Sequence, residues 1–151
     1  MSDFPVPGNV TQAVKLTEGG IVRKVLYVED QQSNLLLVEQ LIARRANWKL
    51  LTAIDGNLGI LMAKANVPDV ILMDINLPGI SGFDVLRILR ADPTFSHVPV
   101  IALSSNAFPG DVLKGIDAGF FRYLTKPYRI SELMNALEDA IRVVLQYEVK
   151  Q

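Results

Sequence analysis

Five short apolar runs recur along this chain, and stretches with the apolar spacing of helices lie between them. The runs cover residues 24–28, 48–54, 69–73, 98–103 and 120–124. They read as continuous apolar segments, which is typical of strands that are buried on both faces of a sheet. Strands that alternate with helices in this way predict an α/β fold: a doubly wound, five-stranded parallel sheet covered by helices on both faces.

The helical stretches have one apolar and one polar side. Residues 34–46 and 131–145 repeat leucine and isoleucine at the spacing of a helix face. Residues 81–91 open with Ser81 three positions before Asp84, a pattern typical of a helix N-terminus. We therefore expect a leader or linker over residues 1–22, one domain over 23–146 and a C-terminal tail over 147–151.

The composition excludes several classes of protein. Lys and Arg number 15 against 16 Asp and Glu, a net charge of -1, so we expect no direct binding to nucleic acid, which calls for a basic surface. Cysteine is absent, which excludes disulfides and thiol chemistry and fits a reducing compartment. No apolar stretch approaches the ~20 residues of a membrane span. We expect a cytoplasmic protein that does not enter the membrane.

Polar side chains follow four of the five runs, at the point where each predicted strand ends. They are Glu29-Asp30, Asp74, Ser104-Ser105 and Thr125-Lys126. The carboxyl ends of parallel strands meet at one edge of the sheet, where ligands bind in folds of this class. The sequence therefore predicts one site that contains three carboxylates, a hydroxyl group and an ammonium group.

This set of groups suits phosphoryl transfer. Crowded carboxylates repel one another, and Mg²⁺ relieves the repulsion because it prefers oxygen ligands. A remaining carboxylate can act as a nucleophile toward phosphorus. Phosphoryl transfer spreads negative charge over the phosphoryl oxygens, which a metal, a lysine and a hydroxyl group stabilise. Taken alone, however, Asp74 before Pro78-Gly79 has the simpler explanation of a turn former.

Residues of about 23–146 resemble the receiver domain of two-component response regulators. The resemblance rests on "VLYVED", "ILMDINLPGISGFDVL", "PVIALSSNA" and "AGFFRYLTKP", which occur in the order and spacing of that family. The phrase "MDINLPGISGFDVL" is most similar to receivers attached to hybrid histidine kinases. The resemblance implies a flavodoxin-like (βα)5 fold with the strand order 2-1-3-4-5.

The resemblance also implies a metal site and a phosphorylation site. Asp74 matches the phosphoacceptor, which also contacts Mg²⁺. Glu29 and Asp30 match the acidic pair that holds Mg²⁺, directly or through water, and the backbone carbonyl of Asn76 matches a further ligand. No other cofactor is implied.

Three more residues match positions that respond to the phosphoryl group. Ser104 and Lys126 match the hydroxyl and the lysine that contact its oxygens, and the Lys126–Pro127 bond is typically cis in the family. Tyr123 matches an aromatic switch residue, although an aromatic side chain in a strand is often ordinary packing.

The implied function is a phosphorelay switch rather than an enzyme, with a low level of autophosphatase activity. The partners would be a histidine kinase or a histidine phosphotransfer protein. The output surface would comprise the fourth helix, the fifth strand and the fifth helix, through which a weak homodimer could also form. We expect Phe121 to lie on the same side of its strand as Tyr123, either contacting a partner or packing onto Phe108 or Pro109.

Three other classes of protein fit parts of the pattern. A Mg²⁺-dependent phosphatase with an Asp nucleophile would have a second acid two residues after Asp74, where Asn76 stands. A flavodoxin-type cofactor binder would have a phosphate-binding loop after the first strand, where this chain carries acidic residues. A receiver that serves only for docking would lack residues of the acceptor site, and all of those residue types are present here.

Overall fold

The computed structural model describes residues 21–106 and 108–150. Its five strands are all parallel and form one sheet in the order β3-β2-β4-β5-β6. The first strand along the chain is labelled β2, so this order is the predicted order 2-1-3-4-5, which is confirmed. The strands are β2 (Arg23–Val28), β3 (Trp48–Ala53), β4 (Val70–Asp74), β5 (Val100–Ser104) and β6 (Arg122–Thr125).

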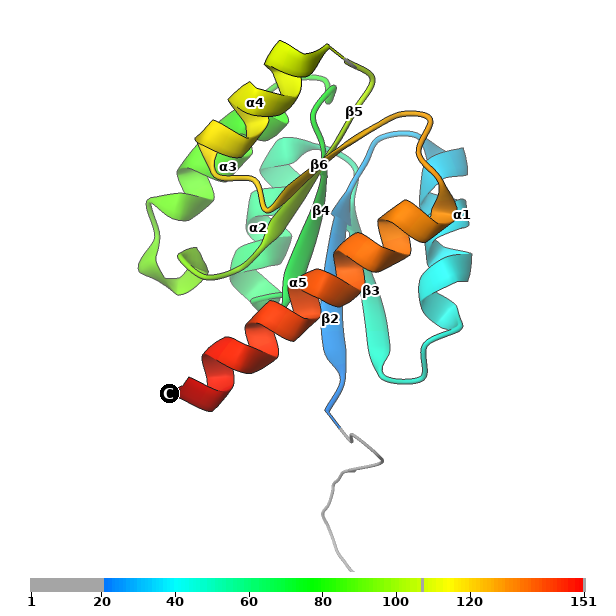
Figure 1. The fold of residues 1–151 in the computed structure, drawn as a ribbon, viewed down its shortest axis with the longest axis vertical. Helices are drawn as coiled ribbons and strands as arrows, with labels where there is room; N and C mark the ends of the chain where they lie inside the picture. The colour runs from blue at the N-terminus through cyan, green and yellow to red at the C-terminus, as the bar shows by residue number, and fades with distance from the viewer. Residues whose placement is uncertain (1–20, 107, 151) are drawn as a thin grey trace, which may run out of the picture.

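Helices cover both faces of the sheet, as predicted (Figure 1). The helices are α1 (Gln32–Ala43), α2 (Gly56–Asn66), α3 (Gly82–Arg90), α4 (Pro109–Ala118) and α5 (Ile130–Lys150), with a short 3-10 helix, η2 (Pro93–Phe95). Side chains of α1 and α5 pack on one face, and those of α2 and α3 pack on the other. Burial is greatest in β4 and β5, in which all five residues of each strand are buried.

Strand alternation divides the apolar side chains of β2 between the two cores. Val25 and Tyr27 pack toward α1 and α5, whereas Leu26 and Val28 pack toward α2 and α3. The register places Tyr27 of β2 beside Leu72 of β4. Since β4 lies between β2 and β5, the residue that ends β4 is surrounded by the ends of its neighbours.

The predicted start of α3 is confirmed. Ser81 is the N-cap residue, and its Oγ accepts a hydrogen bond from the Asp84 N–H at 3.2 Å. The Ser81 hydroxyl also lies 3.2 Å from Oδ2 of Asp84. These bonds satisfy a donor that would otherwise be unpaired at the first turn, so the chain turns into a helix directly after the loop that follows Asp74.

The last helix is longer than the sequence suggests. A tail is expected over residues 147–151, but residues 147–150 continue α5, which has 21 residues, and Gln151 lies outside the described residues. The guanidinium of Arg23, which is almost fully buried, contacts both carboxylate oxygens of Glu148 at 3.0 and 3.1 Å and also pairs with Asp69. These contacts attach the end of α5 to the start of β2 and extend the helix beyond its apolar stripe.

Two further expectations concern the ends of the chain and the membrane. Most of the expected leader, residues 1–20, lies outside the described residues, and β2 begins at Arg23. Within the described part of the chain, no helix has both the length and the apolar character needed to cross a membrane.

Candidate functional site

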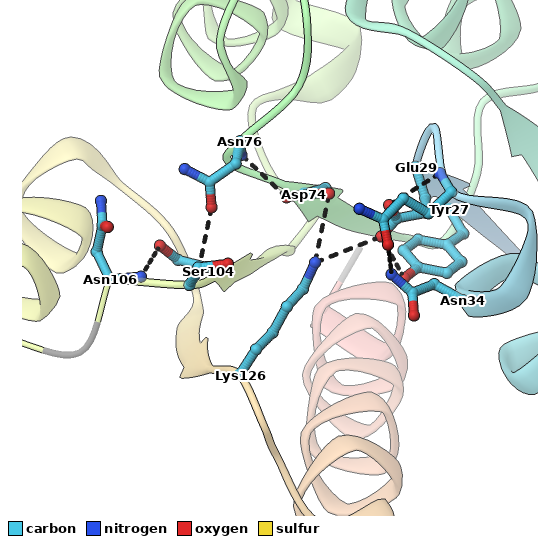
Figure 2. A network of polar contacts seen from close by, with 10 residues as sticks. Tyr27, Glu29, Asn34, Asp74, Asn76, Ser104, Asn106 and Lys126 are labelled. Carbon is cyan, nitrogen blue, oxygen red and sulfur yellow. Dashed lines mark hydrogen bonds and ion pairs between the residues drawn. The ribbon is translucent and has the colours of Figure 1, made fainter.

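Asp74 is the last residue of β4, and its carboxylate is held in one orientation. The side chain is nearly inaccessible to solvent, with 3% of the residue exposed. Its Oδ1 accepts a hydrogen bond from the Asn76 N–H at 2.9 Å, and its Oδ2 lies 3.4 Å from Nζ of Lys126 (Figure 2). A buried strand therefore fixes the position of the carboxylate, and one donor on each oxygen fixes its direction.

The three acidic side chains gather as the sequence predicts. Ligand oxygens of Glu29, Asp30 and Asp74 all lie within 4.8 Å of one another. Glu29 is fully buried, whereas Asp30 is exposed at the mouth of the site. Mg²⁺ prefers oxygen ligands and is usually held through one or two carboxylates together with water. The donor set and its spacing fit Mg²⁺, with Asp30 on the side open to water.

Lys126 brings a positive charge into the site from the end of β6, the strand at the edge of the sheet. It follows β6, yet its Nζ lies 3.4 Å from Oδ2 of Asp74 and 3.6 Å from Oε1 of Glu29. Figure 2 shows this side chain extending across the site to the two carboxylates. The Lys126–Pro127 peptide bond is cis, as expected. The ammonium group is thus placed where it partly balances two buried acidic side chains.

Hydrogen bonds position the hydroxyl and amide groups on the β5 side of the site. Ser104 is fully buried, and its Oγ accepts a bond from the Asn106 N–H at 3.0 Å. Because an acceptor bond uses only a lone pair, the hydroxyl proton of Ser104 can still be donated. The side-chain oxygen of Asn76 accepts a bond from the Ser105 N–H at 3.1 Å. Asn76 therefore connects the loops after β4 and β5, while metal binding by its backbone carbonyl stays a prediction.

Tyr123 lies on the α4 side of β6 and packs against helix α4. Its half-buried ring packs in the core of the α2 and α3 face and meets Phe120 edge-on, with centroids 6.4 Å apart. A Cβ atom at Gly115 of α4 would lie only 2.2 Å from Cδ2 of this ring. Gly115 thus makes room for Tyr123. The sequence signal for this role is a glycine in the middle of a helix, which usually has a packing reason.

Tyr27 also belongs to the site, although it is not among the site residues predicted from the sequence. Its ring is fully buried in β2, and its hydroxyl donates a hydrogen bond to Oε1 of Glu29 at 2.8 Å. Burial, followed by the negative charge of Glu29, raises the pKa of Tyr27 well above its ordinary value, so the hydroxyl stays a donor. The available sequence signal was a tyrosine two residues before an acid in an otherwise aliphatic strand.

The expectation that Phe121 lies on the same side of its strand as Tyr123 is wrong. Phe121 is half-buried and packs with the core beneath α1 and α5, whereas Tyr123 packs with the opposite core. Strand β6 begins only at Arg122, so the bend at Phe121 breaks the alternation on which the expectation was based. The guanidinium of Arg122 lies over the Phe121 ring, 4.2 Å from its centroid. Phe121 is a packing residue in this structure.

Comparisons with known proteins identify the family to which this chain is similar. A family model for the response regulator receiver domain matches residues 25–138. The chain is 36% identical over 104 residues to the response regulator PleD of Caulobacter vibrioides, a match covering 69% of this chain and 23% of PleD. It is 30% identical over 118 residues to the polar-differentiation response regulator DivK of Brucella ovis, covering 78% of this chain and 95% of DivK. The chain thus spans about a quarter of PleD but nearly all of DivK.

Solved structures show the same fold. The chemotaxis protein CheY4 of Vibrio cholerae superposes with a TM-score of 0.71 at 27% identity, covering 79% of this chain and 98% of CheY4. The receiver domain of the sensor histidine kinase PA1611 from Pseudomonas aeruginosa gives a TM-score of 0.70 at 32% identity, covering 80% and 98%. That receiver domain was solved with a magnesium ion coordinated in its active site cleft.

Proposed function

This chain belongs to the family of response regulator receiver domains, and on that premise we propose that Asp74 is the carboxylate that accepts its phosphoryl group. The observation that carries the proposal is the position of the Asp74 carboxylate. It ends a buried strand, lies 3.4 Å from the Lys126 ammonium and shares a 4.8 Å cluster with Glu29 and Asp30. The donor in this proposal is a phosphohistidine of a histidine kinase or of a phosphotransfer protein.

The transfer needs one bond to form and one to break. A carboxylate oxygen of Asp74 attacks phosphorus while the bond from phosphorus to the donor nitrogen breaks, and the electron pair of that bond returns to the imidazole. Lys126 supplies a positive charge beside the incoming phosphoryl oxygens, and the Ser104 hydroxyl can donate a hydrogen bond to them. Magnesium, held by Glu29, Asp30 and Asp74, would supply further neutralisation of the phosphoryl charge.

Accepting a phosphoryl group changes what the hydrogen-bond donors near Asp74 can bind. The Ser105 N–H now bonds to the side chain of Asn76, and Ser104 accepts from the Asn106 N–H. New phosphoryl oxygens compete for these donors and rearrange the loop between β5 and α4. The proposal is that this rearrangement moves Tyr123 and so alters the surface formed by α4, β6 and α5.

The proposal includes slow loss of the phosphoryl group to water, which makes the protein a signalling switch with low autophosphatase activity. It also includes weak self-association through the α4, β6 and α5 surface and no direct contact with nucleic acid. The cysteine-free sequence supports a cytoplasmic location for such a switch.

Phosphorylation from a small donor tests the acceptor directly. The protein is incubated with acetyl phosphate and Mg²⁺, and intact mass is measured for the wild type, Asp74→Asn and Asp117→Asn. Asp117 is an exposed acid of α4 outside the cluster and serves as the matched control. We expect one acid-stable, hydroxylamine-labile phosphoryl group on the wild type and on Asp117→Asn, and none on Asp74→Asn. Undiminished labelling of Asp74→Asn would exclude Asp74 as the acceptor.

A further inference from the structure

Glu29 differs from the other two acids of the cluster in how it is held. Its side chain is fully buried, and three donors surround its carboxylate. The Tyr27 hydroxyl lies 2.8 Å from Oε1, the Lys126 ammonium lies 3.6 Å from the same atom, and the Gln31 N–H lies 3.2 Å from Oε2. Asp30, in contrast, is exposed to solvent.

The three donors differ in how firmly the structure holds them in place. The Lys126 side chain is long, partly exposed and shared with Asp74, so its contact with Glu29 depends on what Asp74 binds. The Gln31 N–H belongs to the loop that enters α1. Only Tyr27 donates from within a central strand, and its ring is fixed by the core beneath α1 and α5.

The geometry of the strand makes the contact between Tyr27 and Glu29 direct. The two residues are two positions apart, so an extended chain places both side chains on the same side of the sheet. Figure 2 shows the tyrosine ring beside Glu29, with its hydroxyl directed at the carboxylate. A glutamate has one more rotatable bond than an aspartate, and an oriented donor limits the conformations that this bond would otherwise allow.

We propose that Tyr27 is a positioning residue of the metal site: its hydroxyl holds the buried Glu29 carboxylate in the orientation that binds Mg²⁺ or its water shell. This inference rests on the proposed function, because it assumes that the acidic cluster binds Mg²⁺. A carboxylate has about four lone-pair sites, so the bond from Tyr27 leaves capacity on Glu29 for the cluster. When a phosphoryl group on Asp74 attracts Lys126, the bond from Tyr27 keeps Glu29 in place.

The competing explanation is that the Tyr27 hydroxyl is only a buried polar group that needs a partner. Buried hydroxyl groups are normally hydrogen-bonded, and Glu29 accepts the hydrogen bond of this one at 2.8 Å. Under that explanation, removal of the hydroxyl changes stability but leaves the affinity for Mg²⁺ unchanged. The two explanations therefore differ in the quantity that the substitution affects.

Calorimetric titration of the whole chain with Mg²⁺ distinguishes the positioning role of Tyr27 from the explanation that its hydroxyl only needs a partner. Tyr27→Phe keeps the ring and removes only the hydroxyl, and Tyr147→Phe makes the same change on α5, where the ring stacks on His97. Loss of a group that orients a metal ligand typically weakens metal binding about 10-fold or more. We expect a rise of about 10-fold in Kd for Tyr27→Phe and no change for Tyr147→Phe. In a Glu29→Gln background, Tyr27→Phe should cause no further loss of affinity for Mg²⁺, because the two residues act as one unit.

Each outcome has a defined meaning. The role of Tyr27 would be overturned if Tyr27→Phe left the Kd for Mg²⁺ unchanged and only reduced thermal stability. It would also be overturned if Tyr27→Phe weakened Mg²⁺ binding equally in the wild type and in Glu29→Gln. Absence of Mg²⁺ binding by the wild type would instead refute the proposed metal site itself. A measurement on the wild type avoids dependence on the variant: with ¹³C-labelled tyrosine, the Cζ resonance of Tyr27 should shift with Mg²⁺ along the binding curve, whereas that of Tyr147 should not. A Tyr27 resonance that does not respond would also overturn the inference.

Discussion

Replacement of Gly115 by alanine should displace the Tyr123 ring, and the structure gives the size of the conflict. The added Cβ would lie 2.2 Å from Cδ2, 2.6 Å from Cε2 and 3.2 Å from Cγ of that ring. Ordinary contact between carbon atoms needs about 3.5–4.0 Å, so the ring or the helix must move by more than about 1 Å. The clash involves a ring edge and one helix, which leaves few ways to relieve it without moving Tyr123.

The expected free energy combines two opposing effects. Overpacking of this kind costs about 1–3 kcal/mol, whereas alanine in a helix interior is favoured over glycine by about 1 kcal/mol. Gly110 of the same helix provides the matched control, because a Cβ there would meet nothing within 4 Å. Gly115→Ala should therefore be less stable than Gly110→Ala by about 1–3 kcal/mol.

Urea unfolding at pH 7, followed by circular dichroism, measures both free energies. A further variant, Gly115→Ala combined with Tyr123→Ala, removes the ring that causes the clash, so the second substitution should abolish the penalty of the first. If Gly115→Ala stabilises the protein as much as Gly110→Ala does, the close packing of Tyr123 on α4 is wrong. If the penalty persists without the ring, the clash involves a different neighbour.

Other parts of the structure give three more predictions. Asp30→Asn should weaken Mg²⁺ binding and prevent labelling of Asp74 by acetyl phosphate, while the metal-free protein stays at least as stable to urea because one crowded carboxylate is gone. Ser104→Ala should still accept a phosphoryl group but lose the changes in amide exchange over residues 105–125 that the wild type shows on phosphorylation. Hydrogen bonding to Arg23 holds the pKa of Glu148 below its ordinary value of 4.5, so its stabilising effect is present above that pH and is lost as the pH falls through the lowered pKa. Thermal unfolding between pH 6 and 3 should accordingly show a small component that Glu148→Gln removes.

The residue types and spacing predict the sheet and the grouping of the acids well. Continuous apolar runs that end in Glu29, Asp74 and Ser104 leave few alternatives, because parallel strands bring their carboxyl ends to one edge. The hydrogen bonds that orient these groups are not predictable in the same way. The bond from Tyr27 to Glu29 depends on which core receives Tyr27, and only the packed structure shows this.

Two expectations from the sequence are wrong, and each has a physical cause. Strand alternation predicts that Phe121 lies on the same side as Tyr123. The strand begins at Arg122, one residue after Phe121, and a bend at Phe121 places its ring on the opposite side. The last helix was expected to end with its apolar stripe, but an ion pair between Arg23 and Glu148 supports its final turns. A local bend thus decides the first case, and a contact distant in the sequence accompanies the second.

The position of Lys126 has a consequence for the selectivity of the acidic cluster. Its ammonium group, close to Asp74 and Glu29, is a counterion that the chain carries covalently, so dilution cannot remove it. Three carboxylates against one ammonium leave an excess of two negative charges, which equals the charge of one divalent ion. A monovalent ion from solution would neutralise only half of that excess and would compete with a tethered charge for the same oxygens. By this count of charges, Lys126 favours a divalent ion over a monovalent ion at the acidic cluster.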